Sequence, residues 1–235
     1  MMNILIIIPC FNEQASLPRL ISDLGNLKLP EKYNVSVCVV NDCSTDDTKQ
    51  VAKKLDVILI DLPVNLGIGG AVQSGLKYAL LNNYDLAVQM DGDGQHPPAE
   101  LQKMIACYEE TGASLVIGSR FIVKEGFQSS FLRRLGITYF HWLNKFFTGK
   151  SIYDSTSGFR LFDKKAIQLS ARYYPDDYPE PESLVFFSKA GLAIKETPVV
   201  MVHRSGGQSS IRSFTSFYYC VKVTLAMFFS FIRKP

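Results

Sequence analysis

Two aspartates separated by a single glycine are the residues whose type and spacing most clearly indicate chemistry. They lie in the segment DGDGQH, residues 91–96, directly after the apolar run LAVQM. The glycines beside Asp91 and Asp93 leave the backbone able to turn both carboxylates toward one point. Hard divalent cations prefer a few carboxylates together with phosphate oxygens. The motif therefore indicates a metal that bridges the phosphates of a nucleotide diphosphate, with a solvated DG turn as the alternative.

Polar residues also follow the other apolar runs of the first half of the chain. They are Asn12 and Glu13, then Asp42, then Asn65, and finally Ser119 and Arg120. A carboxylate such as Asp42 can accept hydrogen bonds from a base or a ribose, and helix capping is the alternative for the residues around it. Gly69 lies in a glycine-rich turn that lets the backbone approach a nucleotide. Because this turn follows the third apolar run and not the first, it disfavours a dinucleotide fingerprint.

The elements that must position these residues alternate between strand-like and helical patterns. Apolar runs at 4–8, 35–40, 57–62, 86–90 and 115–118 predict strands, and helical patterns lie between them. This rhythm predicts an α/β fold, with a Rossmann-like, mostly parallel sheet flanked by helices. Ligands of such sheets bind outside the carboxyl ends of the strands. After Arg120 the rhythm breaks, and we expect the second half of the chain to cap that edge.

The composition excludes some classes of protein. A chain of 235 residues is long enough for one α/β domain with a core, and its formal net charge of +3 does not suggest a nucleic-acid binder. The five cysteines are odd in number and have no CxxC spacing, so neither a disulfide framework nor a zinc site is indicated and a reducing compartment is favoured. The N-terminal apolar run has no basic region before it and predicts a strand, not a signal peptide.

The ordered set of motifs resembles the family 2 glycosyltransferases of the GT-A fold. The set comprises Pro9, Asn12-Glu13, NDCSTDDT at 41–48, NLG at 65–67, DGDGQH at 91–96, GSR at 118–120, DSTSGFR at 154–160, ETPV at 196–199 and RSGGQSS at 204–210. The later motifs are similar to the branch that makes polyprenyl-phosphate sugars, namely dolichyl-phosphate mannose synthases and bacterial undecaprenyl-phosphate hexose synthases. The resemblance extends to about Arg212.

The resemblance implies roles for individual residues. It implies a Mg²⁺ or Mn²⁺ ion at Asp91, Asp93 and Gln95, and nucleotide contacts from Pro9, Glu13 and Asp42. Arg204 would lie on a loop that closes over the donor, and Asp154 would lie in the loop beneath the donor sugar. Arg120, Arg134 and Thr138 fall where the relatives hold an acceptor phosphate. We accordingly expect Asp93, Asp154, Arg120 and Arg134 to be catalytic.

The type of acceptor follows from a missing motif. Family members that polymerise glycans carry a carboxylate base followed by a QxxRW motif, and the sequence has no QxxRW. A phosphate monoester has a second pKa of about 6, so it is already an anionic nucleophile near neutral pH, whereas a sugar hydroxyl needs a general base. The missing motif therefore favours a lipid-phosphate acceptor. The alternative is a transferase that extends a polysaccharide, with Glu180 or Glu182 as the base.

Two segments of the second half predict contact with a membrane surface. A helix over 131–147 places Arg134, Thr138, His141 and Lys145 on one face and aromatic residues on the other. The stretch 214–232 is apolar and aromatic, but Lys222 near its middle is unfavourable in a bilayer. We therefore expect an interfacial helix there, with a spanning helix or a terminal core helix as alternatives. This divides the chain into a GT-A catalytic domain, 1–212, and a juxtamembrane helix, 213–235.

Together these features predict an inverting hexosyltransferase. It would move glucose, N-acetylglucosamine or a similar hexose from a nucleotide-sugar, by preference UDP-linked, to undecaprenyl phosphate for cell-surface polysaccharide or glycan modification. A non-catalytic subunit that binds nucleotide-sugar is a further alternative. The expected partners are the donor, the polyprenyl phosphate, the membrane surface and no nucleic acid. A small membrane-protein subunit and a second copy of the chain are further candidates. The expected location is the cytoplasmic face of the cell membrane.

Overall fold

The chain forms one mixed sheet with helices on both faces. The computed structural model describes residues 1–123, 131–202 and 215–233, without the side chains of 131–135, 137 and 215–219. The described strands form a seven-stranded sheet in the order β3-β2-β1-β4-β6-β5-β7. They are β1 (Met2–Cys10), β2 (Tyr33–Asn41), β3 (Ile58–Asp61), β4 (Leu86–Gln89), β5 (Leu115–Ser119), β6 (Arg160–Asp163) and β7 (Ile194–Pro198). The predicted α/β class is confirmed.

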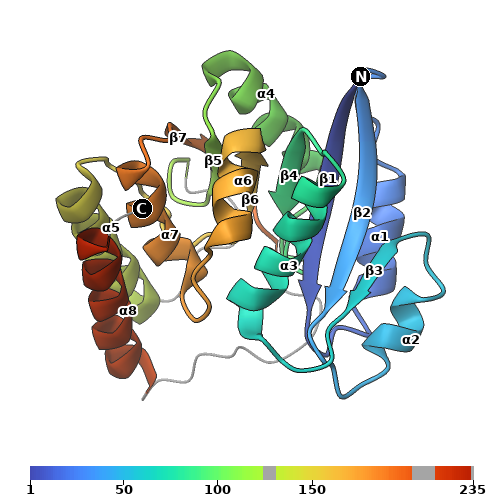
Figure 1. Ribbon diagram of the computed structural model, residues 1–235, viewed down its shortest axis with the longest axis horizontal. Coiled ribbons are helices and arrows are strands. Elements are labelled where there is room, and N and C mark those ends of the chain that lie inside the picture. Colours follow the sequence, from blue (N-terminus) through green and yellow to red (C-terminus); the bar gives the residue numbers. More distant parts are fainter. Residues whose placement is uncertain (124–130, 203–214, 234–235) are drawn as a thin grey trace.

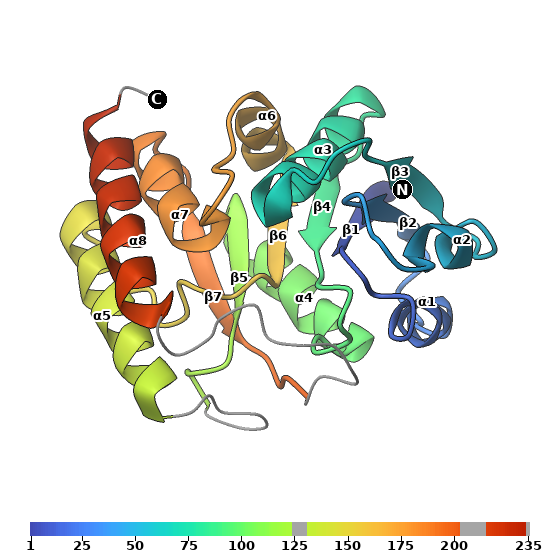
Figure 2. The same ribbon diagram turned by 90° about the horizontal axis from the view of Figure 1, so that it is seen from below.

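Parallel pairing brings the ends of the first strands to one edge of the sheet. β1 pairs in parallel with β2 and β4, and β2 pairs in parallel with β3. The arrowheads of β1 and β2 point to the lower edge in Figure 1, and Figure 2 looks onto that edge. Because the polar residues predicted to carry chemistry follow these strands, the fold gathers them there.

Helices cover the sheet on both sides. They are α1 (Leu17–Gly25), α2 (Thr48–Ala52), α3 (Gly67–Leu81), α4 (Leu101–Thr111), α5 (Phe131–Thr148), α6 (Lys164–Arg172), α7 (Pro179–Lys189) and α8 (Thr215–Ile232), with a short 3-10 turn at Pro98–Glu100. α1 and α4 lie on one face and α3 and α6 on the other (Figure 2).

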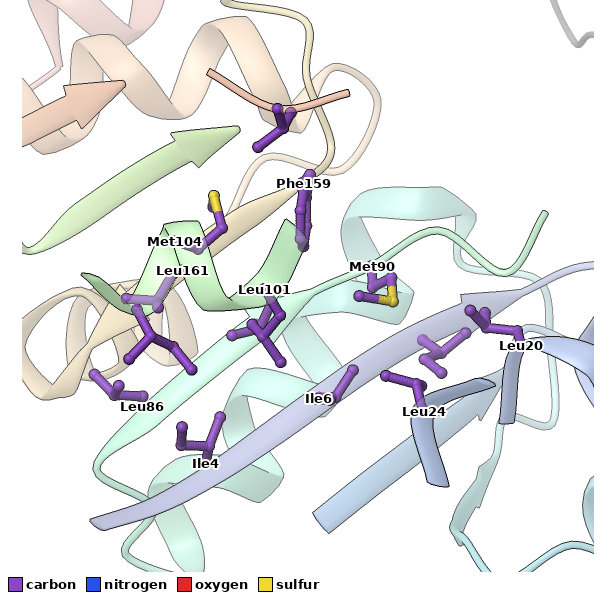
Figure 3. Close-up of a cluster of buried hydrophobic side chains, with 14 of the residues drawn as sticks. Ile4, Ile6, Leu20, Leu24, Leu86, Met90, Leu101, Met104, Phe159 and Leu161 are labelled. Carbon is purple, nitrogen blue, oxygen red and sulfur yellow. The ribbon is translucent and has the colours of Figure 1, made fainter. Parts of the chain in front are cut away.

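Alternate residues of the central strands supply the two cores. Ile4 and Ile6 point to the α1 and α4 side, where they pack with Leu20, Leu101 and other residues (Figure 3). Leu5 and Ile7 point to the opposite side, where Leu76 packs with them. Because these strands are buried on both faces, they read as continuous apolar runs and not as alternating patterns.

The second half of the chain differs from the expected cap, because it extends the sheet. β6 runs antiparallel to both β4 and β5, and β7 pairs in parallel with β5. The direction of β6 follows from its entry point. The preceding loop, 154–160, lies beside Asp91 at the carboxyl edge, so the chain enters β6 there and must run back. No periodic pattern in the sequence indicated β6, because a short polar loop precedes it and the strand has only four residues.

The helices α5, α7 and α8 pack together at the β7 end of the sheet (Figures 1 and 2). Phe140, Val185, Val223 and Met227 form their shared buried cluster. The predicted helices over 131–147 and 214–232 are thus confirmed as helices. Among the described helices, none is long and apolar enough to cross a bilayer. The division of the chain at residue 212 stays a prediction.

A glycine at the start of α3 packs against the loop that precedes α7. The amide of Gly69 donates a hydrogen bond to the carbonyl of Asp176 at 3.1 Å. A Cβ atom at Gly69 would overlap the carbonyl oxygens of Pro175 and Asp176 and lie 2.7 Å from the Asp176 carbonyl carbon. Backbone atoms cannot rotate away as a side-chain end can, so the loop itself would have to move.

We therefore expect Gly69→Ala to lower the free energy of unfolding by about 1–3 kcal/mol through overpacking. Urea denaturation measures this change. Gly25→Ala is the matched control, because no atom lies within 4 Å of its Cβ position. In the helix end it should stabilise the fold by up to about 1 kcal/mol. Equal effects of the two substitutions would contradict the role of the contact.

Candidate functional site

The DGDGQH segment forms a tight loop directly beyond β4. The Asp93 carboxylate is buried and accepts a hydrogen bond from the backbone amide of Gln95 at 2.9 Å, so the loop is closed on itself. Asp91 is partly exposed and its amide donates to Nδ1 of His96 at 3.1 Å. The Gln95 carbonyl accepts from the amide of Val202 at 3.1 Å, which ties the loop to the chain beyond β7. The loop thus fixes both aspartates at the carboxyl edge of the sheet.

His96 is a buried link between this loop and its neighbours. Its ring stacks on Phe159 with 4.9 Å between ring centroids. Burial lowers the pKa of His96 to about 4, and nearby Arg120 acts in the same direction, while Asp93 and Asp154 oppose the shift. The imidazole is therefore neutral near pH 7. An Nδ1 that accepts from the Asp91 amide is consistent with that neutral state.

Arg120 and Asp154 form a buried ion pair next to His96. Nε of Arg120 donates to Oδ2 of Asp154 at 2.7 Å, and Nη2 donates to Oδ1 at 2.6 Å. The Arg120 amide also donates to Oδ2 at 3.0 Å, and the Asp154 side chain is 0% exposed. This bidentate geometry is the strongest form of carboxylate pairing. It joins the end of β5 to the 154–160 loop.

The 154–160 loop crosses directly against Asp91. A Cβ atom at Gly158 would lie 2.9 Å from Oδ1 and 3.1 Å from Oδ2 of Asp91, and 3.2 Å from Nε2 of Gln89. A side chain larger than glycine would therefore have to displace the Asp91 carboxylate. Arg160 is fully buried at the end of the loop, and its guanidinium donates to the carbonyls of Ser157 and Glu180 at 2.9 and 2.7 Å. Arg160 therefore ties the loop to the first turn of α7.

Glu196 of β7 supports the start of the same loop. Its carboxylate accepts from the amides of Tyr153 and Asp154 at 2.7 and 2.8 Å. Burial raises the pKa of Glu196, and these two amides act against that shift. Both hydrogen bonds need the carboxylate as an acceptor, so Glu196 orients Asp154 from outside the loop.

A second polar group lies at the ends of β1, β2 and β3. Oδ1 of Asn12 accepts from the amides of Thr45 and Asp46 at 2.8 and 3.3 Å. Oδ1 of Asp42 accepts from the amide of Leu66 at 2.7 Å, and the Asn65 side chain donates to the Asp42 carbonyl at 3.1 Å. These bonds hold the three strand ends together. Helix capping, the alternative for the residues around Asp42, is also present, because Oδ1 of Asp46 accepts from the Thr48 amide at 2.9 Å at the start of α2.

The two polar groups meet at Gly92. A Cβ atom there would lie 2.9 Å from Sγ of Cys10, 3.2 Å from the carbonyl oxygen of Pro9 and 3.4 Å from Cγ of Glu13. The structure thus brings together, along one edge, the predicted residues Pro9, Asn12, Glu13, Asp42, Asn65, Asp91, Asp93, Gln95, Arg120 and Asp154. Gly69 lies at the start of α3, which follows Asn65 on the same edge.

The donor set of the DGDGQH loop fits a hard divalent cation. In the described part of the chain, no group of three or more His, Cys, Asp or Glu side chains is arranged to hold a metal ion alone. Mg²⁺ commonly binds through one or two carboxylates together with substrate phosphates, so two aspartates are a sufficient protein contribution.

Some predicted residues lie outside the described part of the structure. Arg204 and the side chain of Arg134 belong to these parts. Thr138 is exposed on α5. The roles of Arg134 and Thr138 at an acceptor phosphate, and of Arg204 over the donor, stay predictions. Sequence reasoning assigned no role to Gln89, His96 and Glu196. Gln89 could have been recognised in the sequence as a polar residue inside the apolar run LAVQM.

The buried ion pair yields a stability prediction. Asp154→Ala leaves the Arg120 guanidinium buried without its carboxylate, and we expect a loss of about 3–5 kcal/mol in the free energy of unfolding. Asp23→Ala is the control, because it removes the exposed pair between Arg19 and Asp23 and should change the value by less than about 1 kcal/mol. Chemical denaturation of both variants measures the difference. A small effect of Asp154→Ala would show that the pair does not hold the loop.

Comparison with known proteins places this geometry in a family. Residues 5–169 match the family model described as glycosyl transferase family 2. The chain is 30% identical to the UDP-N-acetylglucosamine–dolichyl-phosphate N-acetylglucosaminyltransferase of Methanococcus voltae over 226 residues, covering 85% of this chain and 86% of the relative. It is 31% identical to the undecaprenyl-phosphate mannosyltransferase of Micrococcus luteus over 222 residues, covering 89% and 88% of the two chains.

A solved structure shares the fold. The glucosyl-3-phosphoglycerate synthase of Mycobacterium tuberculosis, in complex with Mn²⁺, UDP-glucose and phosphoglyceric acid, superposes with a TM-score of 0.73 at 18% identity. The match covers 100% of this chain and 81% of that one. The predicted GT-A-like architecture is thereby confirmed. The family model covers most of the chain, and the two relatives extend over nearly their full lengths, so this chain belongs to glycosyl transferase family 2.

Proposed function

We propose that this chain transfers a hexose from a nucleotide-sugar to a polyprenyl phosphate, with inversion at the anomeric carbon. The observation that carries the proposal is the DGDGQH loop at the carboxyl edge of the sheet, closed on itself and faced by Gly158. The relatives named above are polyprenyl-phosphate sugar transferases, which supports the acceptor class. By this proposal the chain acts on glucose, N-acetylglucosamine or a similar hexose.

The nucleotide binds along the β1, β2 and β3 ends in this proposal. Asp42 is held in place by the Leu66 amide and is buried, so its second carboxylate oxygen has a fixed direction. A fixed acceptor of this kind suits a base or ribose hydrogen bond. Pro9, Asn12, Glu13 and Asn65 shape the same region, and Arg204 closes over the donor. A UDP-linked donor is preferred.

The diphosphate lies at the DGDGQH loop in this proposal. Asp91, Asp93 and Gln95 would hold a Mg²⁺ or Mn²⁺ ion, which supplies positive charge to offset the charge of the departing diphosphate. The Asp93 carboxylate keeps its direction because the Gln95 amide holds one of its oxygens. Asp154 and the glycine-containing loop behind it lie beneath the donor sugar and set its position.

The acceptor phosphate approaches from the face opposite the nucleotide. Arg120, Arg134 and Thr138 are proposed to hold it, and no general base is required because the phosphate is already anionic near neutral pH. The pairing of Arg120 with Asp154 adds a condition. A phosphate that binds Arg120 shares its guanidinium with Asp154. The main role of Arg120 is therefore to position the 154–160 loop, and contact with the acceptor is its second role.

Transfer to a lipid phosphate places the chain at the cytoplasmic face of the cell membrane in this proposal. α5 and α8 lie side by side, and Tyr139 Oη and Thr224 Oγ1 are 2.7 Å apart across them. Both helices carry exposed apolar side chains, among them Trp142 and Phe146 on α5 and Phe228 and Phe229 on α8. Such a surface suits the interface of a bilayer. A small membrane subunit or a second copy of the chain is a further candidate partner for it.

The acceptor and the donor can be tested together. The protein is incubated with undecaprenyl phosphate, Mn²⁺ or Mg²⁺ and a panel of labelled nucleotide-sugars, and the organic phase is extracted. Label in the lipid phase with one donor supports the proposal. Label that enters soluble saccharides and never the lipid would favour a polysaccharide-extending transferase, and nucleotide binding without any turnover would favour a non-catalytic subunit.

Asp93→Asn tests the role of the loop in the same assay. Asparagine keeps an oxygen that can accept from the Gln95 amide, so the loop should keep its shape while one anionic ligand is lost. We expect kcat/KM to fall at least ~100-fold, equivalent to about 2.7 kcal/mol of transition-state stabilisation. Asp56→Asn, at an exposed position before β3, should keep full activity. Full turnover by Asp93→Asn would refute the metal assignment.

Membrane association has its own prediction. Phe229→Glu, at a side chain that is 59% exposed on α8, should reduce binding to phosphatidylglycerol vesicles about tenfold, because an anionic group replaces an inserted apolar one. Leu81→Glu is the control, since Leu81 is 80% exposed at the end of α3. Co-sedimentation measures both. Equal losses would mean that α8 does not make the contact.

A further inference from the structure

Tyr153 is an exposed aromatic residue directly beside the buried ion pair of the site. It is 53% exposed, whereas Asp154, the next residue, is 0% exposed. The amides of both residues donate to the Glu196 carboxylate at 2.7 and 2.8 Å. Because consecutive Cα atoms lie only about 3.8 Å apart, the backbone that carries this ring is fixed close to the pair between Asp154 and Arg120.

His141 of α5 holds the Tyr153 ring from the other side. The two rings stack, with 5.2 Å between their centroids and 17° between their planes. Nδ1 of His141 also donates to the Ile152 carbonyl oxygen at 2.6 Å, so the histidine is tied to the backbone before the tyrosine. The Trp142 ring meets His141 edge-on at 5.9 Å. These separations are typical of aromatic pairs in contact. Tyr153, His141 and Trp142 thus form one surface, which we call the aromatic platform.

The aromatic platform continues along α5 as exposed side chains. Trp142 is 61% exposed and Phe146 is 78% exposed. Thr138, Trp142 and Phe146 follow one another at intervals of four residues, so they share one side of the helix over about 12 Å. Neighbouring exposed apolar side chains of this size mark a binding surface. The surface leads from Thr138, proposed above to hold the acceptor phosphate, to Phe146.

Positive charge accompanies these rings. The α5 sequence FLRRLGITYFHWLNKFFT contains arginines and a lysine and no acidic residue. Nζ of Lys145 lies 5.2 Å from the centre of the Trp142 ring, within the range of a cation–π contact. Cations beside exposed rings suit a molecule that has an anionic head and an apolar chain. A neutral sugar would leave the cations unused, and inorganic phosphate would leave the rings unused.

We propose that the aromatic platform binds the first isoprene units of the acceptor while the acceptor phosphate lies toward Arg120 and Thr138. This rests on the proposed function, because it takes the acceptor to be a prenyl phosphate. The rings are already held by one another and by the Glu196 carboxylate, so they lose little conformational entropy when a chain packs on them. Recognition of the acceptor chain is then separate from the contact of α8 with the bilayer.

The fluorescence of Trp142 tests the proposal without turnover. Trp142 is the only tryptophan of the chain, so its emission reports on the aromatic platform directly. The protein with UDP and Mn²⁺ is titrated with geranyl phosphate, a short prenyl phosphate that needs no bilayer. The emission should shift to shorter wavelength and the shift should saturate. Geraniol, which lacks the phosphate, should bind at least about tenfold more weakly, and inorganic phosphate should cause no shift.

Substitutions of Tyr153 separate the ring from the fold. Tyr153→Ala should weaken the binding of geranyl phosphate about tenfold, because it removes a ring on which the chain packs. Tyr153→Phe keeps the ring and should bind within about twofold of wild type. Leu81→Ala is the matched control, because Leu81 is an exposed apolar residue at the end of α3. The KM for undecaprenyl phosphate should follow the same order, while the affinity for UDP with Mn²⁺ stays within about twofold in every variant.

Phosphatidylglycerol vesicles without prenyl phosphate distinguish the acceptor chain from bulk lipid. Tyr153→Ala should bind these vesicles within about twofold of wild type. The proposal is overturned by an unchanged Trp142 emission with geranyl phosphate, by equal affinities for geraniol and geranyl phosphate, or by equal losses of Tyr153→Ala for geranyl phosphate and vesicles. A wild-type KM for undecaprenyl phosphate in Tyr153→Ala would overturn it as well. Absence of transfer from every donor by the wild-type chain would instead contradict the proposed function.

Discussion

The ion pair between Arg120 and Asp154 is the interaction on which the site depends. It joins the end of β5 to a loop that has no regular structure of its own, and it does so through three hydrogen bonds in a buried place. The loop then places Gly158 against Asp91, Phe159 against His96 and Arg160 beneath the first turn of α7. A buried pair is weak evidence for stability in general, because desolvation opposes the attraction. Here it positions the loop that packs against Asp91 and His96.

Most of the charged side chains at the carboxyl edge are buried. The Asp91 side chain is partly exposed, whereas Asp93 is buried beside His96. Burial lowers the pKa of His96 to about 4, so the imidazole is neutral near pH 7. Arg120 and Arg160 are buried as well, and each is held by carboxylate or backbone oxygens. A neutral imidazole beside Arg120 adds no positive charge next to a buried guanidinium.

The sequence predicted what depends on local pattern and on motif. Continuous apolar runs predicted the parallel strands, and polar residues at their ends predicted the edge where Asp42, Asp91 and Asp93 meet. The place of β6 was beyond reach, because a four-residue strand carries no periodicity and its direction is set by a loop that contacts Asp91. The same limit applies to Glu180 and Glu182. They lie two residues apart at the start of α7 and look alike in the sequence. Their surroundings differ only through the packing of α7, because Arg160 donates to the Glu180 carbonyl while Glu182 lines a cavity with Lys222 of α8.

The contact between Gly69 and the turn at Pro175 and Asp176 constrains how such chains can vary. The start of α3 and the segment before α7 are about a hundred residues apart along the chain. They nevertheless pack so closely that a single added methyl group would push them apart. Covariation between position 69 and the length of that turn is therefore expected across relatives. In a relative with alanine at this position, the turn must lie farther from the start of α3. Grafting the YPDDYPEPE segment onto another scaffold likewise requires a glycine opposite it.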